Sequence, residues 1–148
     1  MLTARNKIDV AYTGVFFEKE SFYTLVSEKL SGSRLHQDVL YPHVTFQYMP
    51  LIIPEDLFEE KAEFKVVGYG NDGLNEGLLV EWQAGAPQLK QLYDEIKIPH
   101  ITLSYAEDGS AVNTRYLDFK PIIPFDISGV FGGFSKSKNR VNIATVII

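Results

Sequence analysis

The sequence contains no cysteine, which removes two kinds of scaffold from consideration. A chain without thiols forms neither a disulfide framework nor a zinc site with thiolate ligands. No apolar run approaches the roughly 20 residues that a membrane-spanning helix needs. The polar stretch 1–9 also lacks the apolar core of a signal peptide. We therefore expect a cytoplasmic protein with no membrane partner.

Positive charge is scarce, because the chain has 14 Lys and Arg residues and 19 Asp and Glu residues, which gives a formal net charge of −5. Proteins that bind long DNA or RNA usually present a basic surface. We therefore expect no long duplex nucleic acid as a partner, and a nucleotide ligand would be small or short. The length of 148 residues suits a single domain spanning 1–148. Nothing in the composition indicates the oligomeric state.

The chain carries one octapeptide twice, and the two copies hold two of its three histidines. The first copy is YPHVTFQY, residues 41–48, and the second is IPHITLSY, residues 98–105. Both have Pro, His, Thr and Tyr at the same places, and all but one of the remaining positions stay apolar. Such an agreement between two distant segments is far less expected by chance than a single His-x-Thr tripeptide.

The surrounding periodicity predicts strands and amphipathic helices in a repeated order. The expected strands are 8–17, 41–48, 63–70, 74–83, 98–105, 122–134 and 140–148, and the expected helices are 19–30 and 86–96. The sequence Asn71-Asp72-Gly73 predicts a hairpin turn. Strand, helix and His-x-Thr strand therefore occur twice in succession. We expect an α+β fold of two lobes related by a pseudo-twofold axis, with antiparallel sheets lining a central cleft and helices outside.

Strand geometry assigns the octapeptide side chains to two faces, because residues i and i+2 point the same way. One face would carry His43, Thr45 and Gln47 in the first copy, and the second copy would present the matching residues His100, Thr102 and Ser104. The apolar residues and the two tyrosines, Tyr48 and Tyr105, would lie on the opposite face. The tyrosines would then pack in the core, and only a β-bulge would instead bring them to the site as stacking surfaces for a base.

Two histidines on a shared cleft suit acid–base catalysis at a phosphodiester. An imidazole titrates near pH 6.5, so one ring can accept a proton from the attacking group while the other donates one to the leaving oxygen. The hydroxyls of Thr45 and Thr102 can donate hydrogen bonds to the phosphate oxygens. This chemistry needs no cofactor and no metal, and the sequence does not decide which of His43 and His100 is the base.

The paired His-x-Thr motifs resemble those of the 2H phosphoesterase superfamily. Its members include RNA ligase-like phosphodiesterases, cyclic nucleotide phosphodiesterases, viral proteins that cleave 2′-5′ oligoadenylates and phage enzymes that degrade cyclic oligonucleotide signals. The resemblance implies a two-lobed 2H fold and catalytic roles for His43, Thr45, His100 and Thr102. It implies a phosphodiesterase whose substrate contains a 2′,3′-cyclic phosphate, a 2′-5′ linkage or a cyclic oligonucleotide.

The sequence offers other candidate residues and other functions beside this interpretation. Tyr12 is a candidate for the cleft and Lys136 for a phosphate contact, while Trp82 could flank the site. His36 has no motif around it and is expected to be a solvated loop residue, because no acidic residue stands at a ligand spacing that would complete a metal site. The alternative functions are a module that sequesters a nucleotide without cleaving it, a metallohydrolase and a structural interaction domain.

Overall fold

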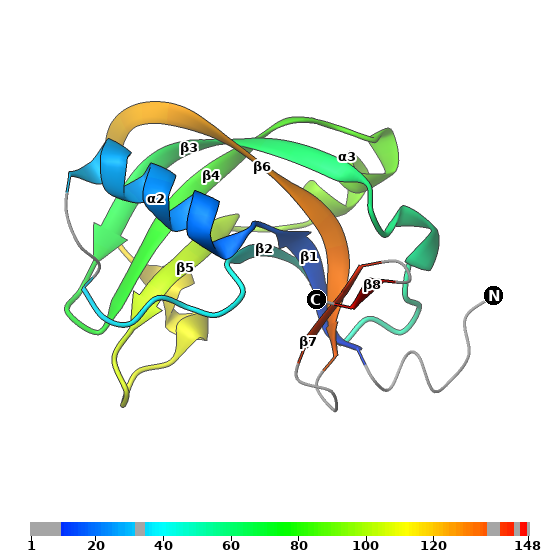
Figure 1. The fold of residues 1–148 in the computed structure, drawn as a ribbon, viewed down its shortest axis with the longest axis horizontal. Coiled ribbons are helices and arrows are strands. Elements are labelled where there is room, and N and C mark those ends of the chain that lie inside the picture. The colour runs from blue at the N-terminus through cyan, green and yellow to red at the C-terminus, as the bar shows by residue number, and fades with distance from the viewer. Residues whose placement is uncertain (1–9, 32–34, 136–139, 144–145, 148) are drawn as a thin grey trace.

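The computed structural model describes the chain except for residues 1–9, 32–34, 136–139, 144–145 and 148. The protein is mostly β, with six antiparallel strands closed into one barrel and a few short helices (Figure 1). The strands are β1 (Val10–Phe16), β2 (His43–Tyr48), β3 (Lys61–Asn71), β4 (Asn75–Gly85), β5 (His100–Tyr105), β6 (Lys120–Ser135), β7 (Arg140–Ile143) and β8 (Val146–Ile147). The helices are α2 (Lys19–Leu30) and α3 (Pro87–Tyr93), with 3-10 turns η1 (Glu55–Leu57) and η2 (Ala111–Tyr116).

The barrel follows the order β1-β2-β5-β4-β3-β6, and β6 pairs with β1 to close it. Closure depends on the length of β6, whose first part pairs with β3 and whose last part pairs with β1. Gly129 lies where β6 passes from one partner to the other, and a Cβ there would stand 2.4 Å from the Phe16 carbonyl oxygen. Glycine therefore permits the close backbone approach at the point of closure.

The expected two-lobed fold is wrong. Each His-x-Thr strand does follow a strand and a helix, as the repeat predicted, but β2 and β5 are neighbours in one barrel wall. The strands β3 and β6 have no counterparts in the repeated pattern, and they join the two units into one closed sheet. The internal repeat therefore predicted the local order of elements correctly and their arrangement in space incorrectly.

Most of the local predictions are confirmed. The helix over 19–30 begins and ends as expected, with the Glu18 carboxylate accepting hydrogen bonds from the first-turn amides. The Asp72 carboxylate accepts hydrogen bonds from the amides of Leu74 and Asn75, which stabilises the predicted hairpin turn between β3 and β4. The second helix ends at Tyr93, three residues before the predicted end.

One main core fills the barrel and the space beneath α2. Alternate residues of β2 and β5 enter it, and these are Val44, Phe46, Ile101 and Leu103. Helix α2 contributes Phe22, Tyr23 and Val26, and the Tyr23 hydroxyl donates a 2.6 Å hydrogen bond to the Leu103 carbonyl. Trp82 packs against Phe64 and Tyr93 on this core, the more common place for such a ring, and does not flank the site. In the described residues, no helix is long and apolar enough to cross a membrane.

Candidate active site

The two octapeptide strands lie side by side and antiparallel, with Val44 directly across from Ile101. In this register, His43 lies across from Thr102 and His100 lies across from Thr45. A local twofold axis through the Val44 and Ile101 pair therefore relates one His-x-Thr unit to the other. The apolar residues point into the core, so the histidines and threonines occupy the opposite face of the barrel wall.

A β-bulge interrupts each octapeptide at the same place. In β2, Thr45 pairs with Gly14 and Gln47 pairs with Thr13, so Phe46 is an extra residue. The second copy repeats this feature around Leu103 in β5. Because a bulge inserts one residue, it reverses the alternation of faces beyond it. The two tyrosines that end the octapeptides are consequently exposed at the site.

Each of the two motif threonines also has a glycine opposite it on the neighbouring strand. Gly14 of β1 faces Thr45, and Gly77 of β4 pairs with Thr102. A Cβ at Gly14 would stand 2.2 Å from the Val44 carbonyl oxygen, and a Cβ at Gly77 would stand 2.9 Å from the carbonyl oxygen of Ile101. Both bulges therefore depend on close backbone approach beside a glycine.

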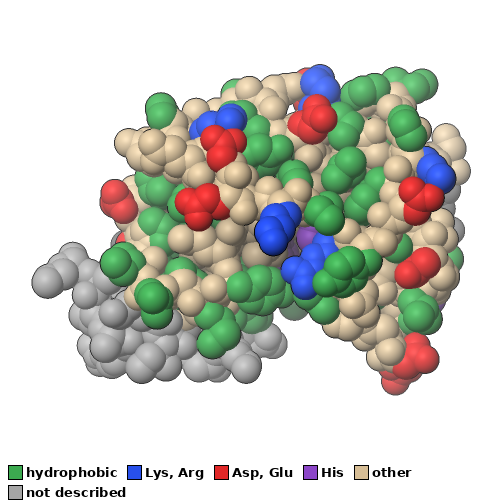
Figure 2. Space-filling model, turned by 180° about the vertical axis from the view of Figure 1, so that it is seen from behind, with side chains coloured by type: hydrophobic (Ala, Val, Ile, Leu, Met, Phe, Trp, Pro, Cys, Tyr) green, Lys and Arg blue, Asp and Glu red, His purple; other side chains and the backbone are tan. Residues whose placement is uncertain are grey.

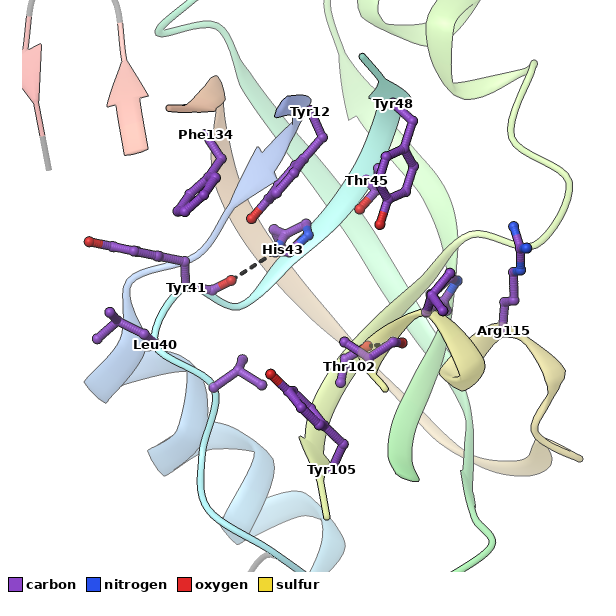
Figure 3. A pocket seen from close by; sticks show the side chains of 14 residues that line it. Tyr12, Leu40, Tyr41, His43, Thr45, Tyr48, Thr102, Tyr105, Arg115 and Phe134 are labelled. Atoms are coloured by element: carbon purple, nitrogen blue, oxygen red, sulfur yellow. Dashed lines mark hydrogen bonds between the residues drawn. The ribbon is translucent and has the colours of Figure 1, made fainter. Parts of the chain in front are cut away.

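A cavity of about 340 Å³ lies over the seam between β2 and β5 (Figure 3). It brings together all four predicted catalytic residues, and Tyr12 lines it as expected. Among the residues that the structure describes, the lining is formed by Tyr12, Val39, Leu40, Tyr41, His43, Thr45, Tyr48, His100, Thr102, Tyr105, Ala111, Val112, Arg115 and Phe134. Figure 2 shows one face of the molecule on which histidine atoms are recessed beside basic side chains.

Each catalytic candidate imidazole is held by the same backbone contact. The Nδ1 atom of His43 lies 2.7 Å from the Tyr41 carbonyl oxygen, and Nδ1 of His100 lies 2.7 Å from the carbonyl oxygen of Ile98. A carbonyl only accepts hydrogen bonds, so Nδ1 carries the proton in both rings. The Nε2 atom of each neutral ring is therefore left with a lone pair, ready to accept a proton.

The two histidines are both easier to deprotonate than a free imidazole, but not to the same degree. Burial lowers the pKa of His43 to about 4, with the nearby His100 adding to this effect and the Tyr41 carbonyl opposing it. Burial also lowers the pKa of His100, and the positive charge of Arg115 lowers it further. His43 is thus neutral at physiological pH.

Aromatic rings account for the dry environment of His43. The Tyr12 ring stacks on the imidazole with centroids 4.6 Å apart, and Phe134 stacks on Tyr12 at 5.2 Å. Phe16 packs against the same imidazole at 5.2 Å. Both faces of the Tyr12 ring are therefore occupied, so Tyr12 positions His43 and does not offer a free stacking surface. Burial raises the pKa of the Tyr12 phenol above its ordinary value, which keeps the hydroxyl protonated.

The two threonines differ in their hydrogen bonding. The Thr45 hydroxyl has no hydrogen-bond partner among the described residues. The Thr102 hydroxyl lies 2.8 Å from the Thr114 hydroxyl and 3.2 Å from the Ala111 carbonyl oxygen. Thr114 is buried and also accepts a 3.0 Å hydrogen bond from the Asn75 amide. A buried polar network therefore orients Thr102, while Thr45 is free to donate to a ligand.

Arg115 is the functional candidate that the sequence did not reveal. It lies on η2 at the rim of the cavity (Figure 3). Its side chain is exposed, and its guanidinium lies over the Tyr116 ring at 4.9 Å. No ion pair to a carboxylate holds it within the described part of the chain. The described lining of the cavity contains no Asp or Glu, although the protein as a whole is acidic. The only sequence signal was one basic residue in a stretch of ambiguous structure.

Four predicted side-chain positions are wrong. Tyr48 and Tyr105 were expected in the core but are 67% and 40% exposed and line the cavity. Gln47 and Ser104 were expected beside the histidines but are absent from the lining. Gln47 accepts a 2.8 Å hydrogen bond from Thr13, and Ser104 is buried. The two bulges are the physical reason for all four differences.

Two candidates from the sequence remain, Lys136 and His36. Lys136 falls outside the described residues. His36 is half-buried in the loop before β2, where its Nε2 lies 2.8 Å from the Gly73 carbonyl oxygen. It does not join His43 and His100 in the cavity. Across the described part of the chain, no three His, Asp or Glu side chains gather as metal ligands would.

Comparison of the sequence with protein-family models and with curated proteins finds no match. The geometry of the cavity therefore has to support any function by itself.

Proposed function

We propose that the protein is a metal-independent phosphodiesterase that acts on a small nucleotide or short oligonucleotide. The observation that carries this proposal is the matched pair of imidazoles, each with Nδ1 bonded to a backbone carbonyl and Nε2 left for the cavity. Two such nitrogens at one site provide the acid and the base for displacement at phosphorus. The chemistry is of the 2H phosphoesterase type, carried by a barrel that differs from the fold expected for that superfamily.

The electrostatics of the cavity favour an anionic substrate. Arg115 and two histidines line it and no described carboxylate does, so a phosphodiester would meet no like charge there. An Arg guanidinium donates paired hydrogen bonds to phosphate oxygens. The free Thr45 hydroxyl adds a neutral donor beside His43. A cationic or neutral sugar substrate would gain nothing from this arrangement.

The pKa values support His43 as the base and His100 as the acid. The neutral His43 accepts a proton on Nε2 from the attacking water or hydroxyl as its oxygen bonds to phosphorus. The bond from phosphorus to the leaving oxygen breaks as that oxygen takes the Nε2 proton of His100. Burial lowers the pKa of His100, and Arg115 lowers it further. A bound phosphodiester neutralises this charge and adds its own, so substrate binding raises the pKa of the acid.

The threonines complete the mechanism by holding the charge that develops on the phosphoryl oxygens. Thr45 donates directly, because no internal partner competes for its hydroxyl among the described residues. Thr102 donates when its hydrogen turns towards the ligand from its two internal acceptors, the Thr114 hydroxyl at 2.8 Å and the Ala111 carbonyl at 3.2 Å. The Thr114 hydroxyl can then donate in turn to the Thr102 oxygen and keep it in place.

A turnover screen in excess chelator tests the proposal. The substrates are 2′,3′-cyclic nucleotides, 2′-5′ oligoadenylates and cyclic dinucleotides, offered to the wild type and to His43→Gln and His100→Gln variants. Asp56→Asn is the control, because Asp56 is an exposed residue on η1 that lines neither this cavity nor its neighbour. We expect chelator-resistant cleavage by the wild type and the control, and a loss of roughly 100-fold or more in each catalytic variant.

Calorimetry on the same proteins separates catalysis from binding. Equal cleavage by the wild type and both catalytic variants would refute the two-histidine mechanism. Binding without cleavage by every protein would indicate a module that sequesters nucleotides. Activity that chelator abolishes would indicate a metallohydrolase instead.

A further inference from the structure

A second cavity of about 530 Å³ adjoins the candidate active site. It lies between the loop 36–40 and the end of β5, and it shares Val39, Leu40 and Tyr105 with the first cavity. The two cavities are therefore separated by one shared wall. A ligand with its phosphodiester at the histidines can extend past Tyr105 into this second space without leaving the surface of the protein.

The two cavities have opposite chemistry. The described lining of the second cavity includes Asp38, Glu107, Gln37 and His36, with no Lys or Arg. Carboxylates repel phosphate and accept hydrogen bonds from N–H groups. The edge of a base is the part of a nucleotide that presents N–H donors. This cavity is therefore suited to a base. Phosphate belongs in the first cavity, beside Arg115.

Asp38 is the acceptor best placed to select a ligand. Its backbone forms an isolated β-bridge with Ser104 of β5, which positions the residue against the barrel. The side chain is half-buried, and it has no hydrogen bond or ion pair to another described residue. A carboxylate that is partly shielded from water and has no protein partner gains most from a donor pair on a ligand.

The wall itself offers a stacking surface. Tyr105 is 40% exposed and, unlike Tyr12, it has no aromatic ring packed against it in the described residues. The bulge at Leu103 turns this ring towards the cavities. Aromatic rings in such positions stack on nucleobases of any sequence.

We propose that the second cavity is a subsite for a second nucleoside, with its base stacked on Tyr105 and preferably guanine. Guanine presents N1–H and the N2 amino group side by side, and these two donors match the two oxygens of Asp38. Adenine and cytosine offer one amino group on that edge and match less well. The substrate is then a dinucleotide or a longer oligonucleotide, linear or cyclic, in preference to a 2′,3′-cyclic mononucleotide. This inference rests on the proposed function for the first cavity.

The test compares cyclic dinucleotides that contain two guanines, one guanine and one adenine, or two adenines. A guanosine 2′,3′-cyclic phosphate serves as the mononucleotide reference. We expect higher kcat/KM for the guanine-containing dinucleotides than for the other compounds. Asp38→Asn should reduce the preference for guanine over adenine by roughly 5- to 150-fold, the range found for a paired base contact. Asp56→Asn, an exposed residue on η1 outside both cavities, is the matched control and should keep the preference.

The result distinguishes failure of this inference from failure of the proposed function. Equal kcat/KM for the mononucleotide and the dinucleotides, or a guanine preference unchanged in Asp38→Asn, would overturn the subsite while leaving the phosphodiesterase in place. Cleavage of no compound would overturn the proposed function. In that case calorimetry tests the subsite independently of cleavage. Tighter binding of the guanine-containing dinucleotides that is lost in Asp38→Asn would support the subsite, and equal Kd values for dinucleotides with and without guanine would refute it.

Discussion

The half-buried imidazole of His43, which aromatic rings shield, predicts a particular dependence of stability on pH. A histidine in an unfolded chain titrates near 6.5, whereas burial lowers the pKa of His43 to about 4 in the folded protein. Between these two values the unfolded chain binds more protons than the folded one. The free energy of unfolding therefore rises with pH across this window and falls as the pH drops from about 6.5 towards 4.

The difference in pKa sets the size of the effect. Each pKa unit corresponds to about 1.4 kcal/mol, so full loss of this contribution amounts to about 3 kcal/mol. In a chain of this length, a loss of that size lowers Tm by roughly 6–12 °C. The lowered pKa of His100 acts in the same direction. Asp72 and Asp126 also have lowered pKa values, but their contributions are lost below about pH 4, outside the window.

The assay is a set of urea unfolding curves measured from pH 7 to pH 4.5. The His43→Gln variant should lose most of the dependence on pH in this window, whatever its absolute stability. His36→Gln should keep it, because His43 is unchanged in that variant. A wild type whose stability is flat from pH 7 to pH 4.5, or a His43→Gln variant as sensitive as the wild type, would refute the reasoning.

Four further predictions follow from the same contacts. The kcat/KM profile should be bell-shaped with an optimum below pH 6.5, because both histidine pKa values are lowered in the free protein; a monotonic rise from pH 5 to 9 would contradict this. Arg115→Met should raise KM about tenfold when KM is measured at low salt. Lys29→Met on α2, which removes a positive charge outside the cavity, is the control and should leave KM unchanged. Thr114→Val should lower the free energy of unfolding by about 1–3 kcal/mol, since Asn75 loses a buried acceptor, and it should also lower kcat. Gly14→Ala should lower Tm in thermal denaturation, because its Cβ would stand 2.2 Å from a backbone oxygen.

The site residues were predictable because the octapeptide is repeated. Hydrophobic alternation placed Val44 and Ile101 in the core and the His-x-Thr residues on the other face, as the structure has them. The same alternation failed at Tyr48 and Tyr105. A bulge depends on pairing with a neighbouring strand, which is a tertiary feature that the spacing of side chains within one strand does not record.

The barrel was not predictable from the repeat, because closure is a long-range property. Nothing local in β6 specifies that its two parts pair with β3 and with β1. Arg115 was missed for a similar reason. Its position at the cavity follows from the buried contacts of Thr114, its neighbour on η2, with Asn75 and Thr102. These three residues are separated in the sequence and form no recognisable sequence motif.

The pairing of β1 with β6 also has a consequence for how fast the protein folds. This pairing joins residues 10–16 to residues 130–135, nearly the whole chain apart. Contacts between such distant segments slow folding, because a long loop must close before they form. Tyr12 and Phe134 belong to these two strands, and their rings shield His43. We therefore expect the dry environment of His43 to appear in the slowest refolding phase, together with closure of the barrel.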